Sequence, residues 1–493
     1  MKTAFNNQKY VEIQSQKIKE RISKNDKLYM EFGGKLFDDN HAARILPGFE
    51  PDTKIKMLQE LKDISEIIIC INAKDIERNK IRADYGITYD IEVLRLIDAF
   101  KSLDLTVNSV VVTMFKGQQG AKKFKSKLES RGIKTYIHTP TQGYPTNVDV
   151  IVSEEGYGQN EYIKTTKPLV VVTAPGPSSG KLGTCLSQLY HEHKNGVKAG
   201  YSKFETFPVW NLPLKHPVNV AYEAATADLK DKNMIDSFHL EKYGEKTINY
   251  NRDLEVFPVL RSILHKITGE NIYNSPTDMG VNMVGFCIDN DEEVIKASKK
   301  EIIRRYYKAI CDAKTGNSDE ETANTIKLLI NELEIDEDTL FPTMKAARDK
   351  HKLENLPVIA IKLPNNKIIT GKKTELLSPA SALIINAIKE LANIKDEVHL
   401  LSPLVLKQIR KLKKYQGSKE LTLSLQEVLI ALSITSSTNP IVEEALSKLE
   451  LLKNSEAHAS YILYNGDLSS LRKLNINLTC DPNFYNNNLY TNE

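Results

Sequence analysis

One stretch of the chain combines the residue types that proteins use to hold phosphate. An apolar run at 169–173 predicts a buried strand, a loop rich in proline, glycine and serine follows it, and a helical pattern begins near Cys185. Backbone N–H groups at a helix N-terminus attract anions, and a lysine there adds a full positive charge. We therefore predict a P-loop-like phosphate site with the binding residues Gly176, Ser178, Ser179, Gly180, Lys181 and Thr184.

The loop departs from a Walker A loop at two positions. That motif needs glycine, four residues and then Gly-Lys-Ser/Thr, whereas Pro175 stands five residues before Gly180 and Leu182 follows Lys181. Leu182 carries no hydroxyl for Mg²⁺, and Thr184 lies about 200° further around a helix. An ordinary strand-to-helix turn with its lysine in solvent is the alternative to a phosphate site.

A phosphate site of this kind supports two classes of function. The first is an enzyme that transfers a phosphoryl or related group, for which a nucleotide with Mg²⁺ would be the cofactor. The second is a non-catalytic protein that senses a phosphorylated ligand, which the missing hydroxyl at Leu182 favours. The residues do not name the ligand or the cofactor.

A second glycine–lysine turn lies near the N-terminus. Gly33, Gly34 and Lys35 follow a predicted strand, and Asp38 and Asp39 come shortly after them. Glycine lets a ligand approach the backbone, lysine can hold phosphate, and carboxylates can hold a metal or act as a base. We predict that the turn binds the ligand and that the two acids are catalytic. A tight turn with solvated charges is the alternative.

Two later segments carry similar residues. The polar loop 277–282 precedes an apolar run, where Asp278 and Asn282 would need partners in a buried setting. Lys372 follows a glycine ahead of the small-residue helix predicted from Pro379, which suggests another anion site. We predict Asp278 as a third catalytic acid and Asn282 and Lys372 as binding residues, although each segment also fits an ordinary turn.

These segments are expected to meet. Ligand sites favour domain junctions and the carboxyl edges of parallel strands. The loop after 169–173 lies at such an edge, and the proline-rich connector 204–220 holds the later residues in place. We therefore predict that Lys181, Asp278 and residues 33–39 line one cleft between domains.

Other clusters favour structural roles over chemistry. His191 and His193 are two residues apart, so a helix would separate them by about 200°, whereas zinc peptidases place their histidines at i and i+4. No metal ligands are predicted. No peptidase activity is expected either, because the chain has no His-Glu-x-x-His and we expect no Gly-x-Ser-x-Gly elbow in it. The basic run 410–414 is typical of a solvated helix face rather than of a nucleic-acid site.

Composition fits a globular protein of about three domains. The chain has 493 residues, of which 41% are hydrophobic and 27% charged. Its net charge of +3 gives no general case for nucleic acid or a membrane surface as a partner. Scattered cysteines suit a reducing compartment, and no apolar run approaches the roughly 18 residues of a membrane span. We expect a cytoplasmic protein whose partner is a phosphorylated small molecule, and a homo-oligomer is left open.

The apolar patterns indicate an α/β protein in several parts. Strand and helix patterns alternate through about residue 195, which is typical of a parallel sheet. Mainly helical segments follow the connector, and strand patterns return near Pro357. The strands expected in the first part are 29–36, 67–72, 110–113, 134–137, 148–152 and 169–173. The expected domains are 1–203, 204–335 and 336–480, followed by a tail, 481–493.

Segments along the whole chain match one known family. The matching stretches are 32–39, 41–44, 46–50, 72–77, 176–188, 203–229 and 277–282, with 370–372 and 381–382 near the C-terminus. On these residues the chain resembles, nearly end to end, a family of uncharacterised bacterial proteins described only as a domain of unknown function. The resemblance implies a multi-domain α/β fold with a helical middle region and a three-layer α/β/α C-terminal domain. It implies no activity, and the ATP-dependent peptidase label of some members has no support in these residues.

Overall fold

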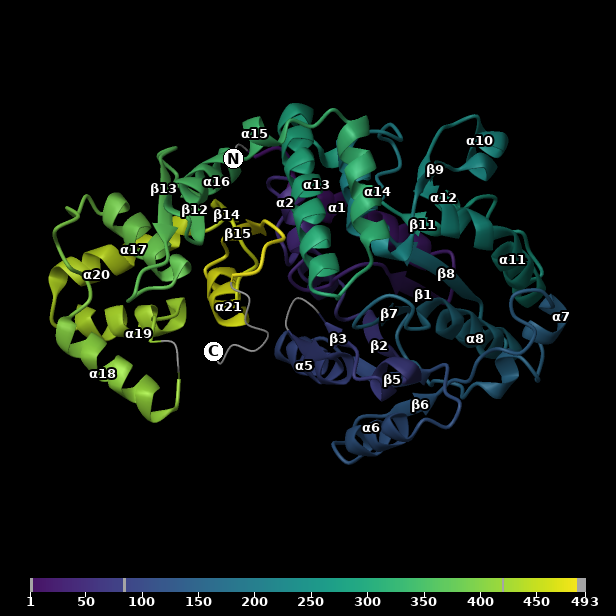
Figure 1. The fold of residues 1–493 in the computed structure, drawn as a ribbon. Helices are drawn as coiled ribbons and strands as arrows, with labels where there is room; N and C mark the ends of the chain where they lie inside the picture. The colour runs from purple at the N-terminus through teal and green to yellow at the C-terminus, as the bar shows by residue number, and fades with distance from the viewer. Residues whose placement is uncertain (1–2, 83–85, 419–420, 486–493) are drawn as a thin grey trace. The chain divides into compact units, whose positions relative to one another are not determined.

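The computed structural model describes residues 3–82, 86–418 and 421–485 (Figure 1). The chain divides into two compact units, Met1–Lys299 and Lys300–Glu493. The end of the predicted tail, from residue 486, lies outside the described residues. The three expected domains rest on changes of pattern along the chain, and their boundaries stay a prediction.

A parallel seven-stranded sheet forms the framework of the first unit (Figure 1). Its strand order is β11-β8-β1-β7-β2-β5-β6, and the neighbouring strands run parallel, so the predicted parallel α/β fold is confirmed. The strands are β1 (Lys27–Phe32), β2 (Ser65–Asn72), β5 (Val107–Thr113), β6 (Thr135–Ile137), β7 (Leu169–Thr173), β8 (Ala199–Phe204) and β11 (Gly280–Val281). The helices around it are α1 (Asn7–Ile22), α2 (Asn40–Ile45), α3 (Thr53–Glu60), α4 (Ala73–Glu77), α5 (Tyr89–Ser102), α6 (Gln119–Glu129), α7 (Val148–Ile151) and α8 (Lys181–Lys194).

The chain leaves two neighbouring central strands in opposite directions. From β2 it passes through α5 to β5, toward one edge of the sheet. From β7 it passes through α8 to β8, toward the opposite edge. Because such crossovers are right-handed, α5 and α8 cover opposite faces. The carboxyl ends of β2 and β7 therefore form the topological switch point, where open α/β sheets bind ligands.

One predicted strand is a helix. Residues 148–152 hold the helical turn α7, which Asn147 caps by accepting a hydrogen bond from the N–H of Val150 at 3.2 Å. A run of β-branched residues favours a strand, but the cap and the packing of Val152 against the core around α8 override that preference. The prediction was wrong because local propensity is weak beside tertiary contacts.

Helices dominate the middle of the chain, as the sequence predicts. The proline-rich connector is clamped by Asn219, whose Oδ1 accepts from the N–H of Val209 at 2.7 Å. Among the described residues, no helix combines the length and apolar character that crossing a membrane requires. The middle elements are α9 (Pro217–Ala225), β9 (Asn233–Ile235), α10 (Ser237–Tyr243), β10 (Ile248–Tyr250), α11 (Asn251–Thr268), α12 (Pro276–Met279), α13 (Asp291–Lys314), α14 (Glu320–Glu332) and α15 (Glu337–Leu340).

The second unit holds a four-stranded sheet, ordered β13-β12-β14-β15, between two layers of helices. Ile359 and Ile361 of β12 share a core with α17 and α19. On the other face, Glu456 of β14 accepts a hydrogen bond from Arg304 Nε of α13 at 3.2 Å. The predicted three-layer arrangement is thus confirmed. Its elements are α16 (Pro342–Glu354), β12 (Val358–Lys362), β13 (Ile368–Lys372), α17 (Pro379–Leu391), α18 (Pro403–Tyr415), α19 (Leu425–Ser436), α20 (Pro440–Ser447), β14 (Glu456–Ala459), α21 (Asn465–Lys473) and β15 (Asn477–Cys480).

Close packing of α17 on β13 depends on one glycine. A side chain at Gly371 would collide with the backbone nitrogen of Leu383 and the carbonyl oxygen of Pro379. Because backbone atoms cannot swing aside, we expect Gly371→Ala to lower the free energy of unfolding of the second unit by about 1–3 kcal/mol in urea.

The matched control is Gly183→Ala in α8, where an added Cβ has no atom within 4 Å. Alanine favours a helix over glycine, so this variant should be neutral or more stable by up to about 1 kcal/mol. An unfolding midpoint of Gly371→Ala equal to that of the wild type would show that the helix does not press on the strand.

Candidate functional site

The predicted phosphate loop ends in a helix N-terminus at the switch point of the sheet. Gly180 has a φ of +81° and immediately precedes α8, which begins at Lys181. The N–H of Thr184 donates to the carbonyl of Gly180 at 3.0 Å. The N–H groups that precede Thr184 in the first turn have no carbonyl one turn back in the helix, so they are free to bind an anion.

Side chains from neighbouring strands hold the loop in shape. Thr113, at the end of β5, donates its hydroxyl to the carbonyl of Ser179 at 2.7 Å. Asn72, at the end of β2, donates its amide to the carbonyl of Ser178 at 3.2 Å. A Cβ at Gly180 would lie 2.7 Å from Thr113 Oγ1, so the loop can approach β5 only with glycine there.

The predicted loop residues differ in what they can offer a ligand. Ser178 is exposed, has a φ of +57°, and its hydroxyl has no partner among the described residues. Ser179 is buried and donates its hydroxyl to the carbonyl of Gly176 at 2.6 Å. Thr184 is buried beneath α8, where its Oγ1 accepts from Cys70 Sγ at 3.4 Å. Thr184 therefore does not provide the hydroxyl that a Walker A loop offers to Mg²⁺.

A row of charged side chains crosses the sheet beside this loop. Glu31 of β1 and Lys203 of β8 occupy paired positions on adjacent strands. Lys181 Nζ lies 3.6 Å from Glu31 Oε1, while Lys203 Nζ lies 2.8 Å from Asp253 Oδ2 and 3.1 Å from Glu205 Oε1. These five residues are called the charged row. Because the sign alternates along it, each charge has an opposite charge beside it.

The charged row is mostly buried but can be reached from solvent. The side chains of Lys181 and Glu31 are each 14% exposed, and those of Lys203 and Asp253 are 20% and 21% exposed. Charges at such depth interact more strongly than they would in water. A ligand that reached the row would therefore meet oriented charges with little competing water.

Burial and the charges of neighbouring side chains shift the pKa values of Lys203 and Glu205. Burial alone would lower the pKa of Lys203, but the carboxylates of Asp253, Glu205 and Glu31 raise that pKa overall. Burial raises the pKa of Glu205; Lys203 opposes this rise, while Asp253 and Glu31 add to it. Lys203 is consequently held as a cation, and Glu205 is a weaker acid than an ordinary glutamate.

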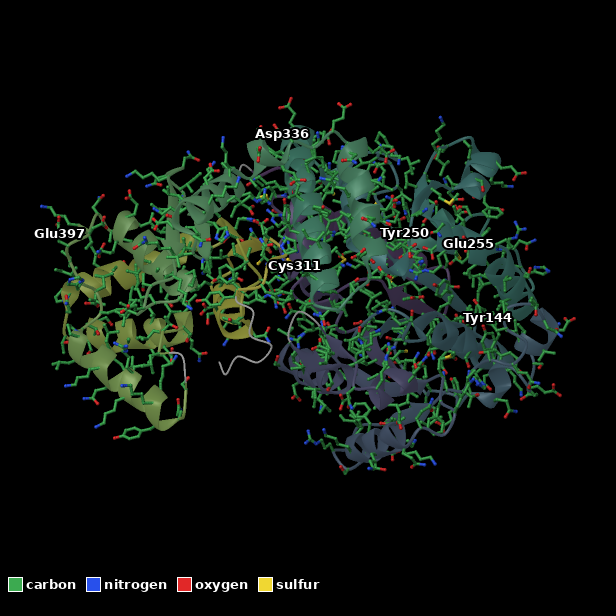
Figure 2. All side chains as sticks on the ribbon, viewed as in Figure 1. Tyr144, Tyr250, Glu255, Cys311, Asp336 and Glu397 are labelled. Carbon is green, nitrogen blue, oxygen red and sulfur yellow. The ribbon has the colours of Figure 1, made fainter. Side chains whose placement is uncertain are left out.

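Three buried polar atoms near the far end of the row have no hydrogen-bond partner in the described part of the chain. They are Glu205 Oε2, Trp210 Nε1 and the hydroxyl of Tyr250, which is labelled in Figure 2. A Cβ at Gly280 would lie 2.8 Å from Glu205 Oε2, so glycine makes room for this carboxylate. An unpaired buried group costs about 1–3 kcal/mol, and native structures retain such groups where water or a ligand completes them.

The donor set of the row does not resemble a metal site. In the described ranges, no three His, Cys, Asp or Glu side chains are placed to share a metal ion. The ammonium of Lys203 contacts one oxygen of Glu205 and one of Asp253, and so occupies the place between them that a divalent cation would need. The Mg²⁺ of a nucleotide would therefore take most of its ligands from phosphate and water.

The glycine turn after β1 lies at the same edge of the sheet as Lys181, because β1 and β7 are adjacent parallel strands. Gly33 donates its N–H to the carbonyl of Phe204 at 3.1 Å, which joins the ends of β1 and β8. Gly34 and Asp38 have φ values of +70° and +52°, so the chain turns sharply on both sides of Lys35.

Asp39, predicted as catalytic, serves the local fold. Its Oδ1 accepts from the N–H of Ala42 at 3.3 Å and caps α2, and its Oδ2 lies 2.8 Å from Nζ of the buried Lys54. Burial would raise the pKa of Asp39, but Lys54 lowers it overall. Both oxygens thus have partners, and the carboxylate is a poor candidate for a base.

Asp278 and Asn282 tie loops together around the edge strand β11. Asp278 Oδ2 accepts from the N–H of Asn274 at 2.9 Å and from the hydroxyl of Tyr243 at 3.0 Å. Asn282 donates its amide to the carbonyl of Pro208 at 2.8 Å. These bonds give partners within the protein to the side chains that we predicted to contact a ligand. The cleft shared with Lys181 stays a prediction.

Lys372 belongs to the second unit and lies in strand β13 rather than at a helix N-terminus. Its Nζ is 2.8 Å from Glu354 Oε2. The following helix, α17, begins at Pro379, after Ser378 has capped it with its own hydroxyl. Lys372 is therefore not positioned at that N-terminus.

Sequence reasoning missed most of the charged row, although part of its signal was visible. Residues 29–32 and 201–204 share the pattern Tyr-x-charged-Phe, and the two strands pair in that register. Their phenylalanines, Phe32 and Phe204, stack with ring centroids 4.4 Å apart. A charge inside an apolar strand needs a partner, so two such strands predict a pair. Asp253 lies on a helix distant in sequence and gave no such signal.

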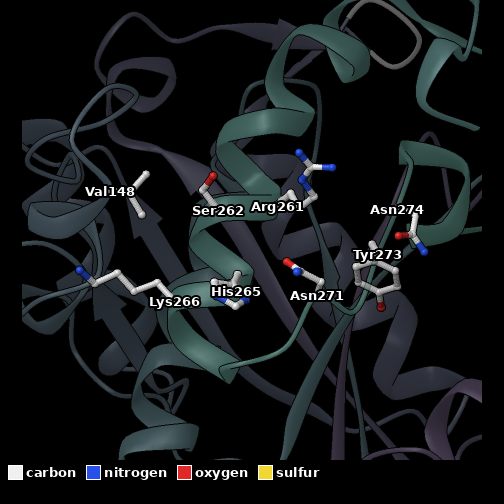
Figure 3. Close-up of a pocket in the computed structure, with 8 residues that line it drawn as sticks. All are labelled: Val148, Arg261, Ser262, His265, Lys266, Asn271, Tyr273 and Asn274. Carbon is white, nitrogen blue, oxygen red and sulfur yellow. The ribbon is translucent and has the colours of Figure 1, made fainter. Parts of the chain in front are cut away.

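Figure 3 shows a different hollow in the first unit, with a volume of about 880 Å³. Its lining contains no residue that the sequence predicted for a site. One wall residue, Tyr273, donates its hydroxyl to the carbonyl of Tyr201 in β8. The carboxyl edge is the stronger candidate because buried, mutually dependent charges meet a helix N-terminus there. The lining consists of Val148, Arg261, Ser262, His265, Lys266, Asn271, Tyr273 and Asn274.

Removal of the central cation should destabilise the first unit. We expect Lys203→Met to lower the free energy of unfolding by about 3–5 kcal/mol at pH 7.5, because Glu205, Asp253 and Glu31 would then face one another. Without Lys203 the pKa of Glu205 rises further in the folded state, so the folded chain binds more protons and the deficit in unfolding free energy should shrink toward pH 5.

Lys203→Arg keeps the charge and should retain most of the stability. Lys194→Met, which removes an exposed lysine from α8, should change stability by at most about 0.5 kcal/mol. Urea unfolding at both pH values measures all three variants. A Lys203→Met deficit that is small, or that grows on acidification, would contradict the electrostatic account of the row.

Comparison with known proteins identifies the family. A domain of unknown function, DUF1846, matches with its N-terminal part over residues 3–334 and its C-terminal part over residues 339–490. UPF0371 proteins of Clostridium botulinum (strain Alaska E43 / Type E3) and Clostridium tetani (strain Massachusetts / E88) are each 56% identical to this chain over 100% of both sequences. A UPF0371 protein of Clostridioides difficile (strain 630) is 56% identical over 99% of this chain and 100% of its own. These names state no activity. The chain therefore belongs to the bacterial DUF1846 family.

Proposed function

We propose that this protein binds a phosphorylated small molecule at the carboxyl edge of its parallel sheet, with the phosphate on the N-terminus of α8. The observation that carries the proposal is the position of Lys181, the first residue of α8, after the left-handed Gly180 and at the switch point of the sheet. Helix dipole, backbone N–H groups and lysine would then act on the same anion.

Lys181 is available for this role. Its contact with Glu31 is 3.6 Å long, whereas Lys203 holds Asp253 at 2.8 Å. A tight lysine–carboxylate hydrogen bond is about 2.7–2.9 Å long, so Lys181 is weakly engaged and can turn to a phosphate. Glu31 would remain balanced by Lys203 on the next strand.

Binding without Mg²⁺-dependent hydrolysis is the form of the proposal that the site favours. Thr184 is buried, and Leu182 occupies the position of the missing hydroxyl. In the described residues no carboxylate trio is placed to hold a metal. A sensor of a phosphorylated ligand, or a transferase that relies on the charged row, fits these facts better than a nucleotide hydrolase. The buried and half-buried free cysteines suit the cytoplasm as the proposed location.

Removal of the Lys181 charge should weaken phosphate binding. We expect Lys181→Met to lower the affinity for inorganic phosphate or adenosine monophosphate by about ten- to a hundredfold in calorimetry, because a charged hydrogen bond contributes about 1.5–3 kcal/mol. Lys194→Met removes a lysine from the other end of the same helix and should leave affinity unchanged. Equal binding by wild type and Lys181→Met, or no binding by the wild type, would refute the proposal. Chemical conversion of the bound ligand by the purified protein would show that the protein is an enzyme and not a sensor.

Residues 176–180 also have the Gly-x-Ser-x-Gly spacing of hydrolase nucleophiles, which the expectation of no peptidase activity overlooked. Ser178 is exposed, but no base contacts its hydroxyl among the described residues, and α8 begins three positions later, at Lys181. We expect no covalent labelling of Ser178 by a fluorophosphonate probe, since an unactivated serine is a poor nucleophile. Labelling that mass spectrometry maps to Ser178, and that Ser178→Ala abolishes, would establish a serine hydrolase instead.

A further inference from the structure

The charged row runs from the phosphate loop across two further strands. Lys181 follows β7, Glu31 lies on the adjacent β1, and Lys203 lies on β8 beyond it. Adjacent strands are about 4.8 Å apart, so the row extends about 10 Å from the loop. This is about the length of a pentose phosphate. A ligand whose phosphate lay on α8 would therefore place its other end over Lys203 and Asp253.

The far end of the row suits hydroxyl groups rather than a second phosphate. Asp253 Oδ1 has no hydrogen-bond partner in the described ranges, while Oδ2 holds Lys203. With Glu205 and Asp253 against Lys203, this end has more negative than positive charge and would repel another phosphate. Carboxylates accept hydrogen bonds from sugar hydroxyls, and a carboxylate binds the ribose hydroxyl beside the phosphate loop of many α/β sheets.

Buried groups at this end still lack partners. Glu205 and Tyr250 are each 8% exposed, and neither Glu205 Oε2 nor the Tyr250 hydroxyl has a hydrogen-bond partner in the described part of the chain. The carboxylate needs a donor and the phenol needs an acceptor. A hydroxyl group is both, and it could satisfy them directly or through one ordered water.

We propose that the ligand is a polyhydroxylated phosphate ester, with Asp253 and Lys203 binding its hydroxyl groups and Glu205 positioning Lys203. The proposal rests on the proposed function, because it assumes that the phosphate occupies the loop. A free sugar phosphate and a nucleoside monophosphate both carry a phosphate and hydroxyl groups. They differ in the base, which only the nucleoside monophosphate carries beyond its sugar.

The test compares three ligands on the full chain by calorimetry. Methyl phosphate offers the phosphate alone, ribose 5-phosphate adds hydroxyl groups, and adenosine monophosphate adds a base. We expect ribose 5-phosphate to bind at least about tenfold more tightly than methyl phosphate, since hydrogen bonds to charged groups are strong. Tighter binding of adenosine monophosphate than of ribose 5-phosphate would identify the source as a nucleotide, and weaker binding would identify a free sugar phosphate.

Variants separate the two halves of the site. Asp253→Asn should lower affinity for ribose 5-phosphate about tenfold and change affinity for methyl phosphate less than about twofold, whereas Lys181→Met should weaken both. Asp149→Asn, which alters an exposed carboxylate paired with Lys266, is the matched control. Tyr250→Phe, which removes the unpartnered buried hydroxyl at the far end, gives a second readout if Asp253→Asn fails to fold, as judged by near-ultraviolet circular dichroism. It should weaken binding of ribose 5-phosphate and leave binding of methyl phosphate unchanged.

The outcomes distinguish the two proposals. If the wild type binds methyl phosphate and ribose 5-phosphate equally, or if Asp253→Asn weakens both alike, the inference about hydroxyl groups is wrong and the phosphate site stands. If the wild type binds none of the three ligands, the phosphate site fails and this inference fails with it.

Discussion

Two charged side chains, Glu31 and Lys203, occupy paired positions on adjacent strands of a buried parallel sheet. Removing a charge from water costs several kcal/mol unless an opposite charge and hydrogen bonds replace the solvent. Each member of the pair is therefore matched a second time, Glu31 by Lys181 and the hydroxyl of Tyr201, and Lys203 by carboxylates. The charged row is the arrangement that lets these residues remain inside the sheet.

The connectivity of the sheet decides where this row lies. Because α5 and α8 leave β2 and β7 in opposite directions, the loop after β7 is open at the carboxyl edge instead of being covered by a crossover. Glu31 and Lys203 each stand one residue before the end of their strand, so both come close to that loop. The buried charges and the N-terminus of α8 thus meet at one edge of the sheet, which is why we propose this edge as the binding site for a ligand with two polar ends.

Several glycine and lysine residues that suggest phosphate binding have packing roles instead. Gly371 lets α17 approach β13, and Lys372 beside it pairs with Glu354 on the surface of the second unit. Asp39 forms a buried ion pair with Lys54 next to the turn at Gly34. The same residue types serve both purposes, since a glycine that admits a phosphate equally admits a neighbouring backbone. Their contacts, which a motif does not contain, decide between the two.

The sequence by itself determined the parallel sheet, the helical middle, the return of strands near Pro357 and the position of the glycine–lysine loop before α8, because these follow from local apolar periods and turn residues. The three layers around the second sheet were expected only from the resemblance to the family. The sequence did not determine α7, where a cap and core contacts outweigh the strand preference of valine and isoleucine. Nor did it determine the charged row, whose members at positions 31, 181, 203, 205 and 253 are mostly far apart along the chain. Strand order and register bring them together, and both are set by the burial of whole faces, so the partner of each charge was decided only by the tertiary structure.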